Sequence, residues 1–176
     1  SLTLMVGTSS ALINASDMVA EPMASIDLLV PIAVGTVSDV SPIAGFEENP
    51  GLALRANILV AAELAGIATA TAEQSTQYAK DREQFGTPIG AFQAVKHRCA
   101  DMAVRAEAAN SLVRYGSLAV LEGLTDANFH AHAARSLAAT YAITNSQINV
   151  QNHGGIGFTW EHTAHRYVTR SRVRSQ

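Results

Sequence analysis

An arginine, an aromatic ring and a glutamine lie close together in residues 81–93, DREQFGTPIGAFQ. The planar guanidinium of Arg82 suits a phosphate or a carboxylate. The Phe85 ring can flank a heterocycle, and the Gln93 amide can read a heterocycle edge as donor and acceptor. Gly86 and Pro88 break the chain between them, so the three side chains can converge. The segment predicts a site for a ligand with a phosphate and a ring.

Each of these residues also has an ordinary structural role. Arg82 could be a helix-end cation that is stabilised by the helix dipole and paired with Asp81 or Glu83. Taken alone, such an arginine is more often structural. Phe85 could anchor the turn in the core, and Gln93 could be a solvated helix residue. The structural interpretation predicts that these side chains are buried or paired within the chain, or, for Gln93, only solvated. The ligand-binding interpretation predicts that they are exposed and converge on one site.

A second segment, QNHGGIGF at residues 151–158, has three glycines in four positions. Glycine lets a backbone approach a ligand closely and can present N–H groups to an anion. The alternative is a helix C-cap followed by a turn. The segment is not a GxGxxG motif after a strand, so it does not predict a dinucleotide-binding fold.

The six histidines do not predict a metal centre. His130 and His132 point to different faces of a helix. His162 and His165 share a face beside Glu161, but a metal would need a third ligand of suitable geometry. No P-loop, nucleophile elbow or HExxH motif is present.

The elements that must position these residues fall into two groups. Residues 1–46 contain short apolar runs rich in Val and Ile, broken by Pro31 and Gly35, which predict four or five strands. From Gly51 onward alanine dominates and the apolar period is helical. We expect helices at about 52–81, 91–121 and 127–152, and a fourth from Thr159, as N-cap, to 172.

The predicted fold class is therefore α+β, with a partial β-domain at residues 1–47. An antiparallel four-helix bundle follows at 48–176, because long helices with short connections pack in that way.

The composition narrows the class of protein. The chain has 176 residues, 48% hydrophobic and only 15% charged, so we expect a partner to cover much of its surface. A net charge of −3 gives no general reason to bind nucleic acid or an anionic membrane. A single cysteine, Cys99, allows no intrachain disulfide and indicates a reducing cytosol. No apolar run reaches the length needed to span a bilayer.

Taken together, YAKDREQFGTPIGAFQAVKHRCADM (78–102) and QNHGGIGFTWEHTAHRY (151–167) resemble the C-terminal half of acyl-CoA dehydrogenases. The resemblance covers residues 50–172, and residues 1–46 are more weakly similar to the end of that family's middle β-domain. The resemblance implies FAD as cofactor and the conversion of an acyl-CoA to a 2-enoyl-CoA.

The resemblance also implies roles for individual residues. Arg82 matches an arginine that binds the FAD pyrophosphate, and Gln84 and Phe85 match positions near the flavin nucleotide. Gln93 and the segment containing Gln151, Gly154 and Gly155 match residues that contact its adenosine and pyrophosphate end. In that family these residues reach into the flavin site of a neighbouring subunit.

Two departures from the family pattern shape the functional hypotheses. The sequence contains neither the N-terminal helical domain nor the first half of the β-domain, which carry the family's own-site flavin contacts. The catalytic base of the family is a carboxylate, and one of its two locations aligns with Ala56; the other would lie beyond Gln176. Glu63, seven residues after Ala56, is the alternative base.

The favoured hypothesis is a short subunit of a heteromeric enzyme, similar to actinobacterial dehydrogenases of steroid side-chain CoA esters. A second acyl-CoA dehydrogenase-like subunit would hold most of the flavin and the base, in a cytoplasmic heterotetramer of two pairs. The other hypotheses are a flavin-free helical scaffold subunit and a part of a self-sufficient homo-oligomeric enzyme.

Overall fold

The computed structural model describes residues 2–6, 9–14, 16, 18–36, 43–46 and 50–176. It divides into two compact units, Ser1–Ala53 and Leu54–Gln176. The boundary predicted between residues 47 and 48 lies in 47–49, outside the described residues. We describe each unit by itself.

The described residues of the first unit form five strands, in agreement with the four or five that the Val- and Ile-rich runs predict. Strands β1 (Leu2–Val6), β2 (Ser9–Ile13) and β5 (Ala44–Phe46) form an antiparallel sheet in the order β1-β2-β5. Strands β3 (Val19–Met23) and β4 (Ile32–Thr36) form a separate hairpin, in which Val19 faces Thr36 and Met23 faces Ile32. The side chains of β3 are exposed. In the turn, the backbone N–H of Leu29 donates to Asp27 Oδ1 over 3.0 Å.

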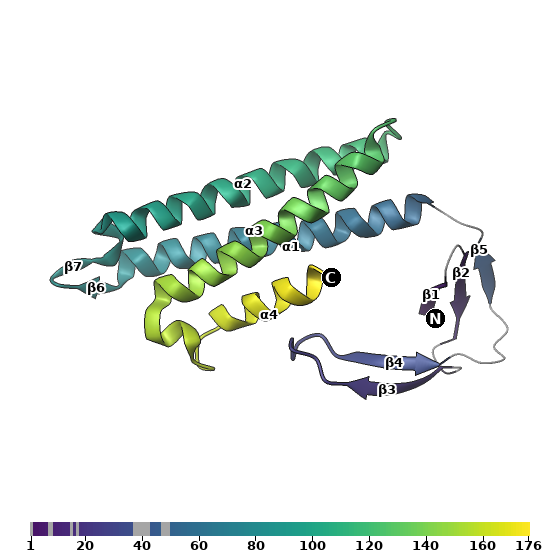
Figure 1. Ribbon diagram of the computed structural model, residues 1–176, viewed down its shortest axis with the longest axis horizontal. Helices are drawn as coiled ribbons and strands as arrows, with labels where there is room; N and C mark the ends of the chain where they lie inside the picture. The colour runs from purple at the N-terminus through teal and green to yellow at the C-terminus, as the bar shows by residue number, and fades with distance from the viewer. Residues whose placement is uncertain (1, 7–8, 15, 17, 37–42, 47–49) are drawn as a thin grey trace. The chain divides into compact units, whose positions relative to one another are not determined.

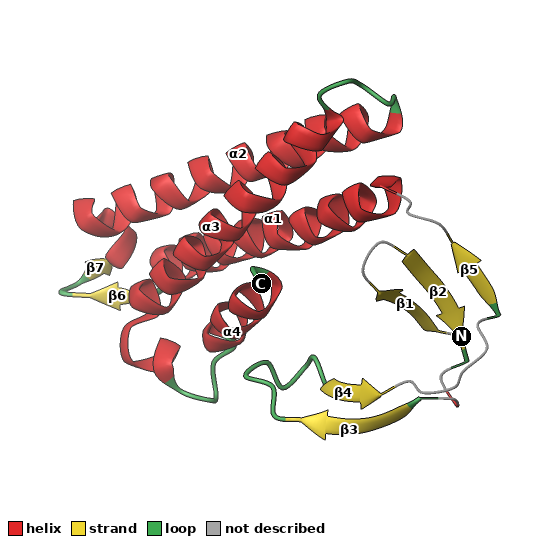
Figure 2. Cartoon of the chain, turned by 45° about the vertical axis from the view of Figure 1, so that its right-hand side comes forward, coloured by secondary structure: helices red, strands yellow, loops and turns green. Residues whose placement is uncertain are grey.

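The second unit is the predicted helical bundle, with α1 (Pro50–Asp81), α2 (Gln93–Leu121), α3 (Ala127–His153) and the short α4 (Ala164–Arg174). Figure 1 shows α1, α2 and α3 running along one another, and Figure 2 shows the same layers from another side. The short elements β6 (Glu83–Gln84), β7 (Thr87–Pro88) and η2 (Ile89–Ala91) connect α1 to α2, and η3 (Gly154–Phe158) follows α3.

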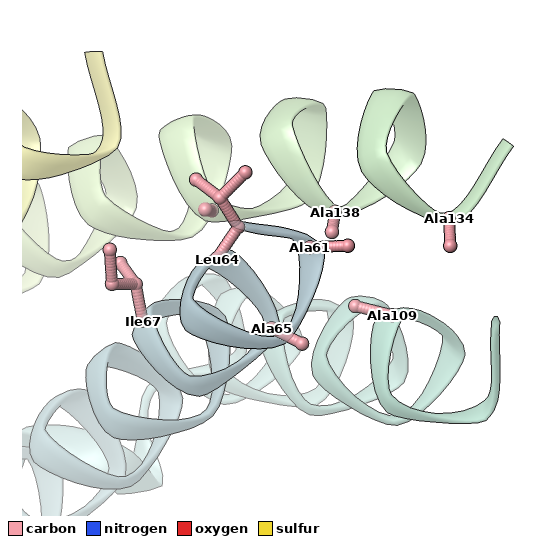
Figure 3. Close-up of a cluster of buried hydrophobic side chains, with 8 residues drawn as sticks. Ala61, Leu64, Ala65, Ile67, Ala109, Ala134 and Ala138 are labelled. Carbon is pink, nitrogen blue, oxygen red and sulfur yellow. The ribbon is translucent and has the colours of Figure 1, made fainter. Parts of the chain in front are cut away.

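Alanine makes up most of the bundle core. Leu64 and Met102 are the largest apolar side chains that are fully buried. Around Leu64 the core is lined from all three long helices, as Figure 3 shows, by Ala61, Ala65, Ala109, Ala134 and Ala138. Such small side chains let the helix backbones approach closely. By length and apolar composition α1 could also cross a membrane, but the same alanine stripe packs on α2 and α3 here.

The predicted start of the fourth helix is wrong. Thr159 is not an N-cap, because its backbone N–H and its hydroxyl both donate to the carbonyl oxygen of Ile156, at 3.1 and 2.9 Å. These bonds close the 3₁₀ turn instead. The helix begins at Ala164, whose N–H donates to His162 Nδ1 over 3.2 Å. A histidine side chain therefore satisfies the first orphan donor.

Two ion pairs hold α4 against α1. Arg170 Nη1 lies 3.2 Å from Glu63 Oε1, and Arg174 Nε lies 2.8 Å from Glu63 Oε2. The Glu63 side chain is one-third exposed. Its carboxylate therefore ties the last helix of the chain to the first one.

Candidate functional site

The break between α1 and α2 is a tight β-hairpin. Glu83 pairs with Pro88 and Gln84 with Thr87, which leaves a two-residue loop of Phe85 and Gly86. Both loop residues have positive φ, 55° and 76°, as a type I′ turn requires. Glycine adopts this conformation freely, whereas for phenylalanine it costs about 1–3 kcal/mol.

The Phe85 ring lies outside the core. It is 95% exposed, and among the described rings it makes an edge contact with Phe92 alone, with ring centroids 6.3 Å apart. This excludes the interpretation of Phe85 as a core anchor under the turn. A strained backbone that presents a large apolar ring to solvent favours contact with a ligand or a partner.

The Arg82 guanidinium is exposed at the base of this hairpin. Its expected neighbour Asp81 accepts two hydrogen bonds from Gln77 Nε2, at 3.0 and 2.9 Å. In the part of the chain that the structure describes, no side chain pairs with the guanidinium. The interpretation of Arg82 as one half of a local ion pair therefore loses its support.

The two glutamines of the first segment are also exposed. Gln84 donates through Nε2 to the carbonyl oxygen of Glu83 over 2.8 Å, and its amide oxygen has no partner among the described residues. Gln93 is the first residue of α2. Its amide has no partner among the described residues.

The glycine segment forms a corner at the end of α3. Gly154 has φ 63°, a conformation that favours glycine. A Cβ atom added to Gly155 would meet nothing within 4 Å, whereas one added to Gly157 would lie 2.5 Å from the carbonyl oxygen of Val150. Packing therefore explains Gly157 but not Gly155. The neighbouring Gln151 is exposed.

The hairpin and the glycine corner lie at the same end of the bundle, as Figures 1 and 2 both show. The Tyr78 and His153 rings stack with centroids 4.2 Å apart. Tyr78 precedes Arg82 by one helical turn, and His153 directly precedes Gly154. The fold thus brings together two segments that are about 70 residues apart in the sequence.

These residues suit a phosphate-bearing ligand with a ring. An exposed guanidinium without a partner can form a bidentate pair with phosphate oxygens. An open corner at Gly155 allows close backbone approach, and the Phe85 ring offers an apolar wall. A metal site has less support, because the described residues contain no group of three potential metal ligands.

His153 has a buried ring, only 4% exposed. Burial lowers the pKa of this imidazole, and the nearby His162 lowers it further, against the opposing effect of the hydrogen bond between Nδ1 and the Asn149 carbonyl oxygen. That bond is 2.8 Å long, and it is consistent with a neutral ring that donates through Nδ1. The sequence does not predict that the rings of His153, Tyr78 and His162 stack, because no local pattern marks a contact between distant rings.

Acidification is expected to destabilise the fold through His153. The unfolded state binds a proton near the ordinary pKa of 6.5, while the folded state binds it only at lower pH. Stability is therefore constant with respect to this group above pH 6.5 and falls as pH decreases below it. Denaturant unfolding at pH 7.5 and 5.5 should show a smaller loss in His153→Gln than in the wild type. An equal loss in both proteins would contradict the shifted pKa.

Neither of the two positions considered for a catalytic base, 56 and 63, carries an unpaired carboxylate. Ala56 is an exposed residue of α1 and has no titratable group. Glu63 is held between Arg170 and Arg174. Each of its carboxylate oxygens lies beside one of these arginines, so both oxygens already have a cationic partner.

Comparisons with known proteins point to one family. The sequence model described as "Acyl-CoA dehydrogenase, C-terminal domain" matches residues 54–175. Acyl-CoA dehydrogenase FadE34 from Mycobacterium tuberculosis is 39% identical over 158 residues, which cover 88% of this chain and 22% of FadE34. Acyl-CoA dehydrogenase IpdE2 from the same organism is 36% identical over 173 residues, which cover 98% of this chain and 52% of IpdE2.

A solved structure shows the same fold. A variant of the Tcur3481-Tcur3483 steroid ACAD has a TM-score of 0.81 and 26% identity, over 94% of this chain and 47% of that chain. The chain spans about half the length of IpdE2 and of this structure, and less of FadE34. The α+β fold with a helical bundle, predicted from the sequence, is confirmed.

Proposed function

Because this chain belongs to the acyl-CoA dehydrogenase family, we propose that it is a subunit of an FAD-dependent enzyme that converts an acyl-CoA to a 2-enoyl-CoA. When bound, FAD would supply the acceptor for the hydride from the β carbon, while a base on the partner subunit would take the proton from the α carbon. The observation that carries the proposal is the exposed Arg82 guanidinium, which no described residue pairs with, near the strained and solvent-facing Phe85.

In this proposal the arm of the chain holds the nucleotide end of FAD. We define the arm as the hairpin with the start of α2, together with the corner after α3. Its site residues are Arg82, Gln84, Phe85, Gln93, Gln151, Gly154 and Gly155. Arg82 binds the pyrophosphate, Gln93 and Gln151 hydrogen-bond the adenosine end, and the two glycines allow close approach. All of these residues except the half-buried Gly154 are exposed, which supports a role toward a flavin held mainly by another subunit.

The partner in this proposal is a second acyl-CoA dehydrogenase-like subunit, in a cytoplasmic heterotetramer of two pairs that is not embedded in a membrane. The paired name of the Tcur3481-Tcur3483 steroid ACAD supports a heteromeric assembly. By the same likeness we propose a steroid side-chain CoA ester as the substrate. Flavin absorbance of a purified complex, with both subunits counted, should give one FAD per pair.

A flavin-free scaffold subunit is the second candidate function. Two observations favour it. The position that aligns with the family's base is an alanine, Ala56, and the carboxylate of Glu63 is paired with Arg170 and Arg174. The two functions predict a different visible absorbance for the purified complex. A purified complex that carries FAD contacts through this chain absorbs near the flavin maximum and loses that absorbance when the arm is altered.

Glu63→Gln is expected to leave turnover within about threefold of the wild type. Loss of a general base typically costs about 10²–10⁴-fold, whereas Glu63 already serves as an ion-pair partner of α4. The variant should instead loosen α4 and lower the melting temperature slightly. Steady-state rates of the assembled enzyme test this, with the exposed Glu73→Gln on the same helix as control. A loss of turnover beyond about 10²-fold would make Glu63 the base.

The isolated chain is expected to associate rather than remain a monomer. The helical unit exposes large apolar side chains along its long helices, including Leu59 (71%), Leu121 (80%) and Phe129 (69%). Obligate interfaces that cover such surfaces usually bury more than about 2,000 Å². Sedimentation of the folded chain should show a dimer or a larger species. A single sharp monomer boundary would contradict the expectation.

A further inference from the structure

α1 and α3 meet beneath the arm through polar and aromatic contacts rather than apolar ones. The residues of this contact, which we call the α1–α3 seam, follow helical spacing on both helices. They are Gln74, Ser75 and Tyr78 on α1, and Asn149, Asn152 and His153 on α3. Toward the other end of the same two helices, most of the buried contact is apolar and is made by alanines with Leu64 and Ile67.

Each pair in the seam has a direct contact. Asn149 Nδ2 donates to Gln74 Oε1 over 2.6 Å, and Asn152 Nδ2 donates to Ser75 Oγ over 2.7 Å. Asn149 is fully buried and Asn152 is 7% exposed. The third contact is the stack of Tyr78 on His153.

Such a seam is a costly way to join two helices. The Oδ1 atoms of Asn149 and Asn152 are buried and accept no hydrogen bond from the described residues, and an unsatisfied buried acceptor destabilises the fold. Alanines would join the helices without this cost. Directional bonds, however, fix one register, because sliding α1 along α3 by a turn would separate every pair. The seam thus favours one defined placement of the helix ends over maximal stability.

The seam ends directly at the two halves of the proposed flavin site. The carbonyl oxygen of Tyr78 accepts the backbone N–H of Arg82 over 2.9 Å. His153 is bonded covalently to Gly154, and its ring lies between Tyr78 and His162, with the His162 centroid 4.3 Å away. A displacement of the backbone at Tyr78 or His153 would therefore move Arg82 relative to the glycine corner, and the stacked rings oppose such a displacement.

We propose that Tyr78 and His153 are positioning residues, whose stacked rings hold Arg82 and the Gln151–Gly155 corner in the spacing that one FAD molecule requires. This inference rests on the proposed function. Neither ring contacts the cofactor in this proposal; both act through the residues beside them. A ring at position 78 is required, and its hydroxyl is not.

The test compares FAD affinity with apo stability in the purified complex. Tyr78→Leu should weaken FAD binding at least tenfold, measured by flavin fluorescence titration, while Tyr78→Phe stays within about threefold of the wild type. Tyr141→Leu is the matched control, because Tyr141 is a half-buried tyrosine of α3 that packs on the alanine core. It should lower the melting temperature of the apo complex and leave FAD affinity unchanged.

If Tyr78→Leu does not fold, His153→Gln makes the same comparison, since it removes the ring and keeps a side-chain donor. Equal FAD affinity in Tyr78→Leu, His153→Gln and the Tyr141→Leu control would overturn the positioning role. The proposed function would survive that result if Arg82→Ala still weakened FAD binding. A folded wild-type complex that binds no FAD would overturn both proposals.

Discussion

Arg82→Ala is expected to weaken FAD binding by about 10- to 100-fold while the apo complex keeps its melting temperature. A hydrogen bond to a charged group contributes about 1.5–3 kcal/mol, and about 1.4 kcal/mol corresponds to a factor of ten in affinity. The Arg82 side chain is exposed and has no partner among the described residues, so its removal costs the fold little. Flavin absorbance per complex and apo melting curves measure the two effects separately.

Two further variants sharpen this test. Arg82→Lys should restore FAD binding only in part, because an ammonium keeps the charge and cannot form the planar fork. Arg114→Ala is the control for charge, since Arg114 is an exposed arginine farther along α2. It should leave FAD affinity unchanged. Full FAD occupancy in Arg82→Ala would return Arg82 to the role of a helix-end cation.

The helix bounds could be predicted because alanine periodicity is a local signal. The three long helices begin and end within about two residues of the predicted positions, and Gly154 ends α3 at the predicted glycine signal. For residues 86–88 the sequence predicts only a break between two helices, and not the type I′ hairpin that Phe85 and Gly86 form. Its loop holds a phenylalanine at positive φ, where turn chemistry would favour asparagine or glycine.

Contacts between distant segments could not be predicted from local patterns. Asn145, Asn149 and Asn152 would be taken for a solvated helix face, yet they are buried. Asn145 Nδ2 donates to the carbonyl oxygens of Ala68 and Met102, at 3.1 and 2.9 Å. The stack of Tyr78 on His153 likewise joins two residues that are 75 positions apart in the sequence. Only tertiary packing decides which polar face of a helix is covered.

In the candidate site, too, the sequence predicts what depends on residue type and does not predict what depends on tertiary structure. The residue types in the two segments predicted the ligand class, because a guanidinium, a ring and open glycines suit a nucleotide whatever the fold around them. The decision between that interpretation and the structural one needed exposures and partners. Phe85 at 95% exposure and Gly155 with empty space beside it are facts that sequence spacing does not contain.

Gly155 and Gly157 offer a matched pair of substitutions with opposite expected effects. A Cβ atom at Gly157 would lie 2.5 Å from the Val150 carbonyl oxygen and 3.0 Å from the His153 Cβ atom. Because a backbone oxygen cannot move aside, Gly157→Ala should destabilise the bundle by about 3 kcal/mol. That corresponds to a melting temperature roughly 10 °C lower.

Gly155→Ala should leave the fold intact and weaken FAD binding at least tenfold. A Cβ atom there meets nothing within 4 Å of this chain, and replacing glycine where the backbone permits it stabilises a protein by about 0.4–1 kcal/mol. If the FAD pyrophosphate approaches the backbone at this corner, the same methyl group occupies its space. Melting curves and flavin titrations of both variants separate these effects. Wild-type FAD affinity in a folded Gly155→Ala complex would mean that the cofactor does not approach this corner.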